Sequence, residues 1–164
     1  MKNYHQTVGK IVSLLKENNY WYETFEHEPV RTSEEAVKTR PGYTLKQGAK
    51  AIIIKVKIPN VGKSFMMLVF PANERFNNDK LKTFLGAKET RFATEKEVGE
   101  ITNGIQPGGV PPFGNLFGLK VIVDTSLFLN EKIVFNAGDR SFSLAMKSQD
   151  YKTIVNPQIA DIVS

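Results

Sequence analysis

The sequence predicts a mixed, largely antiparallel α+β domain extending over residues 1–164. Segments with helical periodicity alternate with short β-branched runs, and turn signals between neighbouring runs suit hairpins. At 164 residues the chain is long enough to bury one good core. It contains no repeat, linker or low-complexity tract, so we expect one domain with helices around one sheet system.

The N-terminal part predicts a helix, a strand and a second helix. Apolar residues recur at helical spacing over about residues 4–18, which predicts an amphipathic helix. Residues 21–25 alternate large and small side chains, as in a strand. Thr32, followed by acidic residues, is typical of a helix N-terminus, and residues 40–42 (Arg-Pro-Gly) break the chain.

The middle of the chain predicts a hairpin followed by two short helices. Residues 51–56 are nearly all apolar and β-branched, which indicates a well-buried strand, and residues 64–70 form a second strand. The Pro-Asn-Val-Gly segment at 59–62 suits the turn between them. Residues 78–85 and 94–101 are expected to be helices, the latter beginning with a capping box.

The C-terminal part begins with a Gly- and Pro-rich loop over residues 104–118. Loops of this length in small domains are more often functional than accidental. Residues 121–123, 133–135 and 141–146 are then expected to be strands. Residues 159–163 are expected to form a final short helix.

Composition limits the possible functions. The chain has 22 Lys and Arg against 17 Asp and Glu, a formal charge of +5. This excess favours a polyanionic partner, or it is a solubilising surface charge. The excess is spread out, whereas DNA readers concentrate it in a stripe, so no DNA partner is expected. No apolar run suits a membrane span, and residues 1–6 lack a signal pattern. The absence of cysteine excludes disulfides and thiol chemistry and fits the cytoplasm.

Lys50 is the first candidate site residue. It stands where a buried strand begins, and its ammonium group must reach solvent or an anion. It either extends from the strand end into solvent or contacts a phosphate or a developing oxyanion.

A rigid glycine loop is the second candidate. Glycine lets backbone amides approach a ligand closely, and adjacent prolines stiffen the loop in advance. Rigid N–H groups near a carbonyl are what an oxyanion hole requires; a plain surface turn is the alternative. The loop consists of Gly108, Gly109, Val110, Pro111, Pro112, Phe113 and Gly114.

Two further segments are weaker candidates. Asn136, Ala137 and Gly138 follow a strand and form either a second backbone nest or an ordinary turn. His27 either touches substrate or has a structural role. Only His5 accompanies it, so neither a metal site nor a cofactor is expected.

Together these segments resemble the YbaK-like family of aminoacyl-tRNA deacylases, which includes relatives of the editing domain inserted in bacterial prolyl-tRNA synthetases. The resemblance covers essentially the whole chain, and the order and spacing of the motifs make it specific. The motifs are residues 26–29 with 32–36, 47–50, 68–73, 91–94, 108–114, 123–127 and 135–138.

The resemblance implies a twisted, barrel-like sheet and hydrolysis of the ester between a wrong amino acid and the 3′ end of tRNA. Lys50 would hold the terminal adenosine and its phosphate. The 108–114 loop would clasp the aminoacyl group, and a substrate hydroxyl would help to activate water. Because the chain offers no obvious general base, positioning and backbone electrostatics would supply most of the rate.

The hypothesis is therefore a metal-free, trans-acting deacylase of mischarged tRNA, with tRNA-Pro carrying a wrong small amino acid as the expected substrate. Prolyl-tRNA synthetase is a candidate partner. Lys50, Gly108 and Gly109 would be catalytic; His27, Thr32, Ser143 and the remaining loop residues would bind substrate. Ser143 stands near where some cysteine-specific relatives place an acidic residue, which leaves the amino-acid preference open. The rival hypotheses are a non-catalytic module that binds tRNA or a synthetase, and a hydrolase of another small ester.

Overall fold

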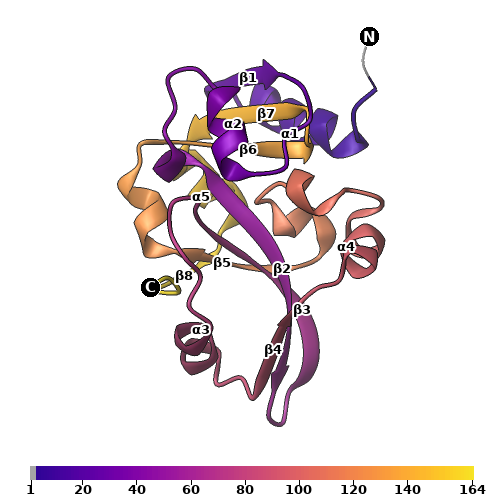
Figure 1. Cartoon of the computed structure of the whole chain (residues 1–164), viewed down its shortest axis with the longest axis vertical. Helices are drawn as coiled ribbons and strands as arrows, with labels where there is room; N and C mark the ends of the chain where they lie inside the picture. Colours follow the sequence, from indigo (N-terminus) through magenta and orange to yellow (C-terminus); the bar gives the residue numbers. More distant parts are fainter. Residues whose placement is uncertain (1–2) are drawn as a thin grey trace.

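Two β-sheets form the centre of the computed structural model, which describes residues 3–164. In Figure 1 the three-stranded sheet lies above the long β2–β3 hairpin of the five-stranded sheet. The strand orders are β1-β7-β6 and β4-β2-β3-β5-β8. The strands are β1 (Tyr22–Glu26), β2 (Ala49–Ile58), β3 (Gly62–Pro71), β4 (Glu89–Phe92), β5 (Lys120–Asp124), β6 (Lys132–Asp139), β7 (Phe142–Lys147) and β8 (Gln158–Ala160).

The pairing confirms a mixed, largely antiparallel α+β fold. Only the β3–β5 and β5–β8 pairs of these sheets are parallel. The expected barrel-like closure is not confirmed, because the described strands form two separate sheets. Between the sheets, one isolated parallel bridge joins Gly48 to Val134.

The β2–β3 hairpin explains the continuous apolar run in the sequence. Successive side chains of a strand point to opposite faces. Ile53 and Met67, which face each other in the register, enter the core that is shared with α1 and the three-stranded sheet. Ile54 and Met66 enter a second core on the opposite face. Because both faces are buried, the strands lack the usual alternation of polar and apolar residues.

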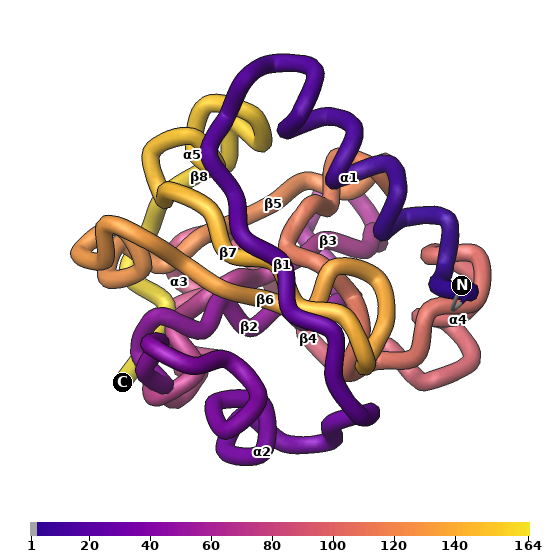
Figure 2. Tube along the Cα trace, turned by 90° about the horizontal axis from the view of Figure 1, so that it is seen from above, coloured from indigo at the N-terminus to yellow at the C-terminus, as the bar shows by residue number. Residues whose placement is uncertain are grey.

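The helices surround these sheets, with α1 and α2 flanking the three-stranded sheet in the view of Figure 2. They are α1 (Gln6–Glu17), α2 (Ser33–Lys38), α3 (Asn78–Leu85), α4 (Glu95–Thr102) and α5 (Ser148–Val155). Short 3₁₀ turns occur at η1 (Leu45–Gln47), η2 (Pro107–Gly109), η3 (Gly114–Phe117) and η4 (Thr125–Leu129). None of the helices in the described part of the chain is long and apolar enough to cross a membrane.

One predicted element is wrong and two were missed. Residues 159–163 do not form a helix: β8 pairs in parallel with the edge of β5, and the Ile162 N–H donates to the buried Asp124 carboxylate at 2.8 Å. This pairing satisfies backbone groups that a helix would have bonded internally. Helix α5 and strand β4 were not predicted.

The three-stranded sheet carries the one tryptophan of the chain at its edge. Trp21 directly precedes β1, and the Lys132 ammonium of β6 lies over its ring, 4.3 Å from the centroid. This cation–π contact joins the two outer strands across the central strand β7.

Candidate active site

A cavity of about 510 Å³ opens between α2, the start of β2, strand β6 and the glycine loop. It brings together segments that the sequence singled out far apart along the chain. The predicted site residues that line it are Thr32, Lys50, Gly108, Val110 and Asn136. The other lining residues are Val30, Arg31, Ser33, Glu34, Ala36, Val37, Arg40, Leu45, Gly48, Ala49, Ala51, Ile52, Ala72, Pro107 and Phe135.

Lys50 lies at the edge of this cavity, on the second residue of β2. Its neighbour Ala49 is buried, whereas Lys50 itself is exposed. Neither of the two ion pairs found within residues 3–164 involves Lys50. Its ammonium group is therefore available to an anionic ligand without first breaking an internal ion pair.

The glycine loop reaches the cavity through Gly108 and Val110, whereas Gly109 is buried and does not line it. The Gly109 N–H already donates to the Gln106 carbonyl at 2.8 Å, whereas the Gly108 N–H has no backbone acceptor in the described chain. The Gly108 carbonyl accepts from Asn136 Nδ2 at 2.8 Å. Side chains on these glycines would crowd Arg140, because a Cβ would lie 3.1 Å from its Nε at Gly108 and 3.3 Å from its N at Gly109. The Gly-Gly pair thus packs closely against Arg140, against its side chain at Gly108 and its backbone at Gly109.

Beneath the cavity lies a polar network centred on Arg40, which sequence reasoning missed. Arg40 is only 6% exposed. Its Nε donates to Ser143 Oγ and its Nη2 to Asn136 Oδ1, both at 2.9 Å. His27 Nε2 lies 2.8 Å from the same Ser143 oxygen. Through Asn136 the network reaches the Gly108 carbonyl and so fixes the peptide at the cavity wall.

The network leaves a fixed positive charge at the cavity. Burial lowers the pKa of Arg40 to about 10, so its guanidinium stays protonated at neutral pH. No ion pair within residues 3–164 involves Arg40. Its Nη1 makes no hydrogen bond there and points toward Gly48 in the cavity wall. With Lys50 and Arg31 against Glu34, the lining carries excess positive charge and favours an anionic ligand.

The rest of the glycine loop lies in the core. Pro111, Pro112, Phe113 and Gly114 are buried. The Phe113 ring packs against Phe135 and Tyr151, with centroids 5.6 and 5.5 Å away. The Tyr151 hydroxyl donates to the Pro112 carbonyl at 2.6 Å. Phe135 and Tyr151 thus support the buried part of the loop from the core. The contact of residues 111–114 with substrate stays a prediction.

Ala137 and Gly138 also lie away from the cavity. They belong to β6, in an irregular stretch where the register with β7 shifts between Asn136 and Asp139. Gly138 has φ +119°, and a Cβ there would lie 3.0 Å from Thr7 of α1. The bulge directs Asn136 toward the Gly108 loop while Gly138 packs against the helix.

Two further observations concern the positions of His27 and Ser143 and the possibility of metal binding. Neither His27 nor Ser143 lines the cavity; Ser143 is hydrogen-bonded to the lining residues Arg40 and Asn136, and His27 is hydrogen-bonded to Ser143. Within residues 3–164 no group of three or more His, Asp or Glu side chains is arranged to hold a metal ion.

Comparison with known proteins places this chain in the class of aminoacyl-tRNA editing proteins. The model of the family described as "Aminoacyl-tRNA editing domain" matches residues 27–154, which include the whole cavity lining. The chain therefore belongs to the aminoacyl-tRNA editing domain family.

Individual relatives agree with this assignment. The chain is 31% identical over 156 residues to the Escherichia coli multifunctional Ser/Thr-tRNA deacylase ProXp-y, covering 94% of this chain and 92% of that protein. It is 26% identical over 116 residues to the proline–tRNA ligase of Ralstonia pickettii, covering 71% of this chain and 20% of the ligase. A crystal structure described as a proposed trans-editing enzyme for prolyl tRNA synthetase superposes with TM-score 0.80 at 20% identity, covering 99% of both chains. The predicted family and enzyme class, an aminoacyl-tRNA deacylase, are confirmed.

Proposed function

We propose that this chain, as one editing domain spanning residues 1–164, acts in trans on mischarged tRNA in the cytoplasm. It would hydrolyse the ester between the amino acid and the 3′-terminal ribose. One observation carries the proposal: a single cavity collects the free cation of Lys50, the backbone of Gly108 and the buried charge of Arg40. A phosphate-bearing ester with a small acyl group matches that combination.

The proposed chemistry needs no side-chain base. Lys50 would contact the phosphate of the terminal nucleotide as a point charge. The Gly108 N–H would face the ester carbonyl and stabilise the oxyanion that forms when water attacks. The bond between the acyl carbon and the ribose oxygen then breaks, and the proton lost by the attacking water passes to that oxygen, so that the products are the amino acid and a free tRNA hydroxyl. A substrate hydroxyl would orient the water, so that positioning contributes most of the acceleration.

The polar part of the cavity favours a small hydroxylated amino acid. The Asn136 amide NH₂ donates to the Gly108 carbonyl, and its oxygen accepts hydrogen bonds from Arg40 and Ser143. Arg40 Nη1 is then the free donor that could bind a substrate hydroxyl. The relative named as a Ser/Thr-tRNA deacylase supports seryl and threonyl esters as the first candidates. Mischarged tRNA-Pro remains the other candidate, and the similarity to proline–tRNA ligases supports a prolyl-tRNA synthetase partner.

The test is a deacylation panel with a matched lysine control. Serine, threonine, alanine, cysteine and proline esters on tRNA-Pro, with seryl and threonyl esters on their own tRNAs, are followed for ester loss. Lys50→Ala should lower kcat/KM by about 10- to 150-fold, because a hydrogen bond to a charged group such as this phosphate is worth about 1.5–3 kcal/mol. Lys46→Ala removes an exposed lysine that lines no described cavity and should leave the rate unchanged.

Both lysine variants should unfold like the parent protein, because both side chains are exposed. Full activity in the Lys50 variant would refute the proposed role of this residue. Tight binding of charged tRNA with no loss of any ester would instead support the non-catalytic binding module.

A further inference from the structure

A second cavity, of about 540 Å³, adjoins the first at Lys50. The two share Lys50, Ala51, Ile52, Pro107 and Val110 in their linings. The second cavity is not lined by Arg40 or Gly108 and extends to β4 and the segment before α3. Its remaining lining residues are Ile53, Phe70, Glu74, Arg75, Phe76, Phe92, Ala93 and Val98.

Three phenylalanine rings form a series that reaches solvent at this cavity. Phe70 is buried, and its ring stacks on Phe76 with centroids 6.3 Å apart and an interplanar angle of 24°. Phe76 in turn packs against Phe92 at 6.2 Å. Phe92 is 61% exposed although it lies beside this apolar series. Its ring is therefore held by neighbours on one side and open to a ligand on another.

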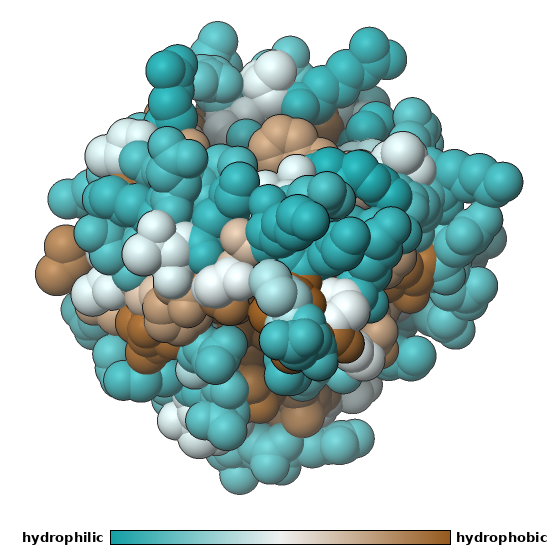
Figure 3. Space-filling model, turned by 90° about the horizontal axis from the view of Figure 1, so that it is seen from below, coloured by the Kyte–Doolittle hydropathy of each residue, from teal (hydrophilic) through white to brown (hydrophobic). Residues whose placement is uncertain are grey.

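The lower end of the molecule carries both hydrophilic and apolar surface (Figure 3). Figure 1 places the β2–β3 hairpin, α3 and β4 at the lower end of the molecule. Viewed from that side, apolar surface shows between hydrophilic side chains in the middle of the face (Figure 3). Exposed aromatic side chains beside a charged cavity are more informative than scattered apolar residues.

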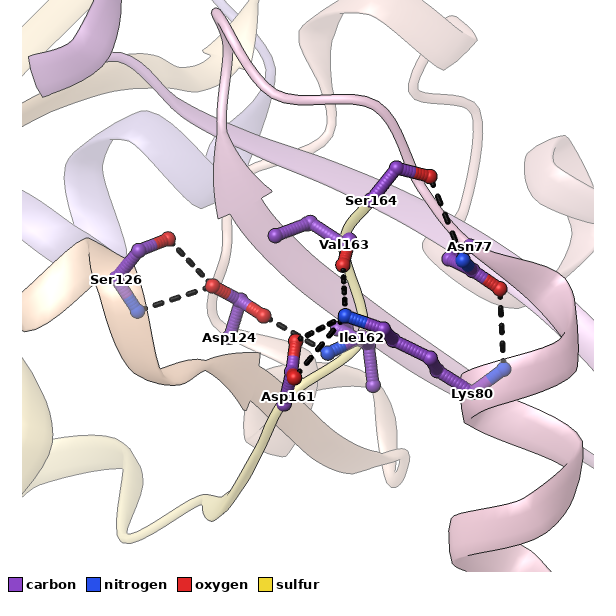
Figure 4. Close-up of polar contacts among 8 residues, drawn as sticks. All are labelled: Asn77, Lys80, Asp124, Ser126, Asp161, Ile162, Val163 and Ser164. Atoms are coloured by element: carbon purple, nitrogen blue, oxygen red, sulfur yellow. Dashed lines mark hydrogen bonds and ion pairs between the residues drawn. The ribbon is translucent and has the colours of Figure 1, made fainter.

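The segment that carries Arg75 and Phe76 is held in place by the C-terminal residues 162–164. The Asn77 N–H donates to the Ile162 carbonyl at 2.8 Å, and the Ser164 N–H donates to the Arg75 carbonyl at 2.9 Å. Figure 4 shows Lys80 reaching from α3 to Asp161 and to the Val163 carbonyl. The ring of Phe76 is thus positioned before any ligand arrives.

The charges beside the rings suit a nucleic acid backbone. Lys50 and Arg75 are exposed cations of this lining, and neither takes part in the ion pairs found within residues 3–164. Glu74 supplies the single carboxylate of the lining. A groove that combines aromatic faces with cations is the usual platform for unpaired bases, because every base has a face that can stack.

We propose that the second cavity is a stacking site for an unpaired nucleobase of the RNA 3′ end. The inference rests on the proposed function, in which Lys50 contacts a phosphate of that end. Because Lys50 lies between the two cavities, a strand whose aminoacyl group occupies the first cavity passes directly into the second. There Phe92 provides the stacking face, Phe76 supports it, and Arg75 contacts the backbone.

The experiment measures binding rather than turnover, so that it does not depend on the proposed hydrolysis. The probe is an uncharged RNA hairpin with a single-stranded 3′ CCA overhang, compared with the same hairpin with a blunt end. Phe92→Ala should raise the Kd for the overhang RNA by about 5- to 150-fold, which corresponds to about 1–3 kcal/mol for one base–aromatic stack. Phe92→Trp keeps an aromatic ring and should bind the overhang RNA as tightly as the parent. Phe92→Leu keeps an apolar side chain but no ring, so its Kd should rise as in Phe92→Ala.

Phe84→Ala is the matched control. Phe84 is a 45% exposed phenylalanine on α3 that lines neither cavity, so its removal should leave the Kd unchanged. Arg75→Ala should reduce the slope of log K against log salt by about 0.7, the value for one phosphate contact on a single strand.

Overhangs of one, two and three nucleotides identify the base. A Phe92 effect that is already complete with one nucleotide assigns the terminal base, and an effect that needs two or three assigns a preceding one. An unchanged Kd for Phe92→Ala, with parental RNA binding intact, would overturn the stacking site and leave the deacylase proposal standing. No ester hydrolysis by the parent protein would refute the deacylase proposal instead.

Discussion

Replacing Tyr151 by phenylalanine removes one buried hydrogen bond that supports the glycine loop. The Tyr151 hydroxyl donates to the Pro112 carbonyl at 2.6 Å, and the whole residue is buried. Burial raises the pKa of Tyr151 above its ordinary value, so the hydroxyl keeps its proton at assay pH. Phenylalanine retains the edge contact with Phe113 at 5.5 Å. The substitution therefore isolates the hydrogen bond from the packing.

The magnitude follows from the acceptor that is left behind. A buried carbonyl deprived of its partner costs about 1–3 kcal/mol of unfolding free energy. In a chain of this size 1 kcal/mol corresponds to about 2–4 °C, so Tm should fall by about 2–12 °C. Deacylation well below that temperature should persist, because Asn136 holds Gly108 at the other end of the loop.

Urea unfolding followed by circular dichroism measures this loss, with Tyr43→Phe as the control. The Tyr43 hydroxyl donates to Glu23 at the surface, at 2.9 Å. Its removal should change stability by no more than about 0.5 kcal/mol. A Tyr151→Phe protein that unfolds at the same urea concentration as the parent would refute the support assigned to this hydroxyl.

Two further predictions concern packing and acid stability. Gly114→Ala should lower the free energy of unfolding by about 1–3 kcal/mol, because the added Cβ would lie 2.6 Å from Val121 Cγ2. Adding Val121→Ala to this variant should recover part of the lost stability, as measured by thermal unfolding. The Arg91 hydrogen bond and a Thr94 backbone N–H lower the pKa of Glu97 to about 2. The ionised carboxylate stabilises the fold above the ordinary carboxyl pKa, and this stabilisation is lost as the pH falls toward 2. At low salt, the free energy of unfolding of Glu97→Gln should therefore fall less steeply than that of the parent as the pH drops from the ordinary carboxyl pKa toward 2. The same pH dependence in both proteins would contradict this stabilising role of Glu97.

The sequence predicts those elements whose local pattern agrees with their final environment. The β2–β3 hairpin is predicted correctly because its β-branched run and its turn residues both indicate a hairpin, and in the structure the turn has positive φ at Asn60 and Gly62. Strand β4 was missed because Glu89–Phe92 is polar and short, and only pairing with β2 makes it a strand. The residues around Ile159 form strand β8 and not the predicted helix, because they pair with the edge of β5.

The sequence also predicts part of the lining of the candidate cavity. Lys50, Gly108 and Asn136 converge on one cavity, as their motifs indicate. The role of Arg40 could not be predicted, because the sequence shows only an arginine before a proline at a chain break. Burial of its guanidinium depends on the approach of β6 and β7, which is a tertiary event. Phe113 is the opposite case: it belongs to a site motif but lies in the core.

The position of Trp21 has a spectroscopic consequence. As the one tryptophan, it reports fluorescence from beside β1 and from the Lys132 ammonium over its ring, on the three-stranded sheet. Circular dichroism averages over both sheets. Coincident unfolding curves from the two signals would mean that the sheets melt as one cooperative unit. An earlier fluorescence transition would mean that the Asn136 side of the cavity opens while the strand bearing Lys50 is still folded.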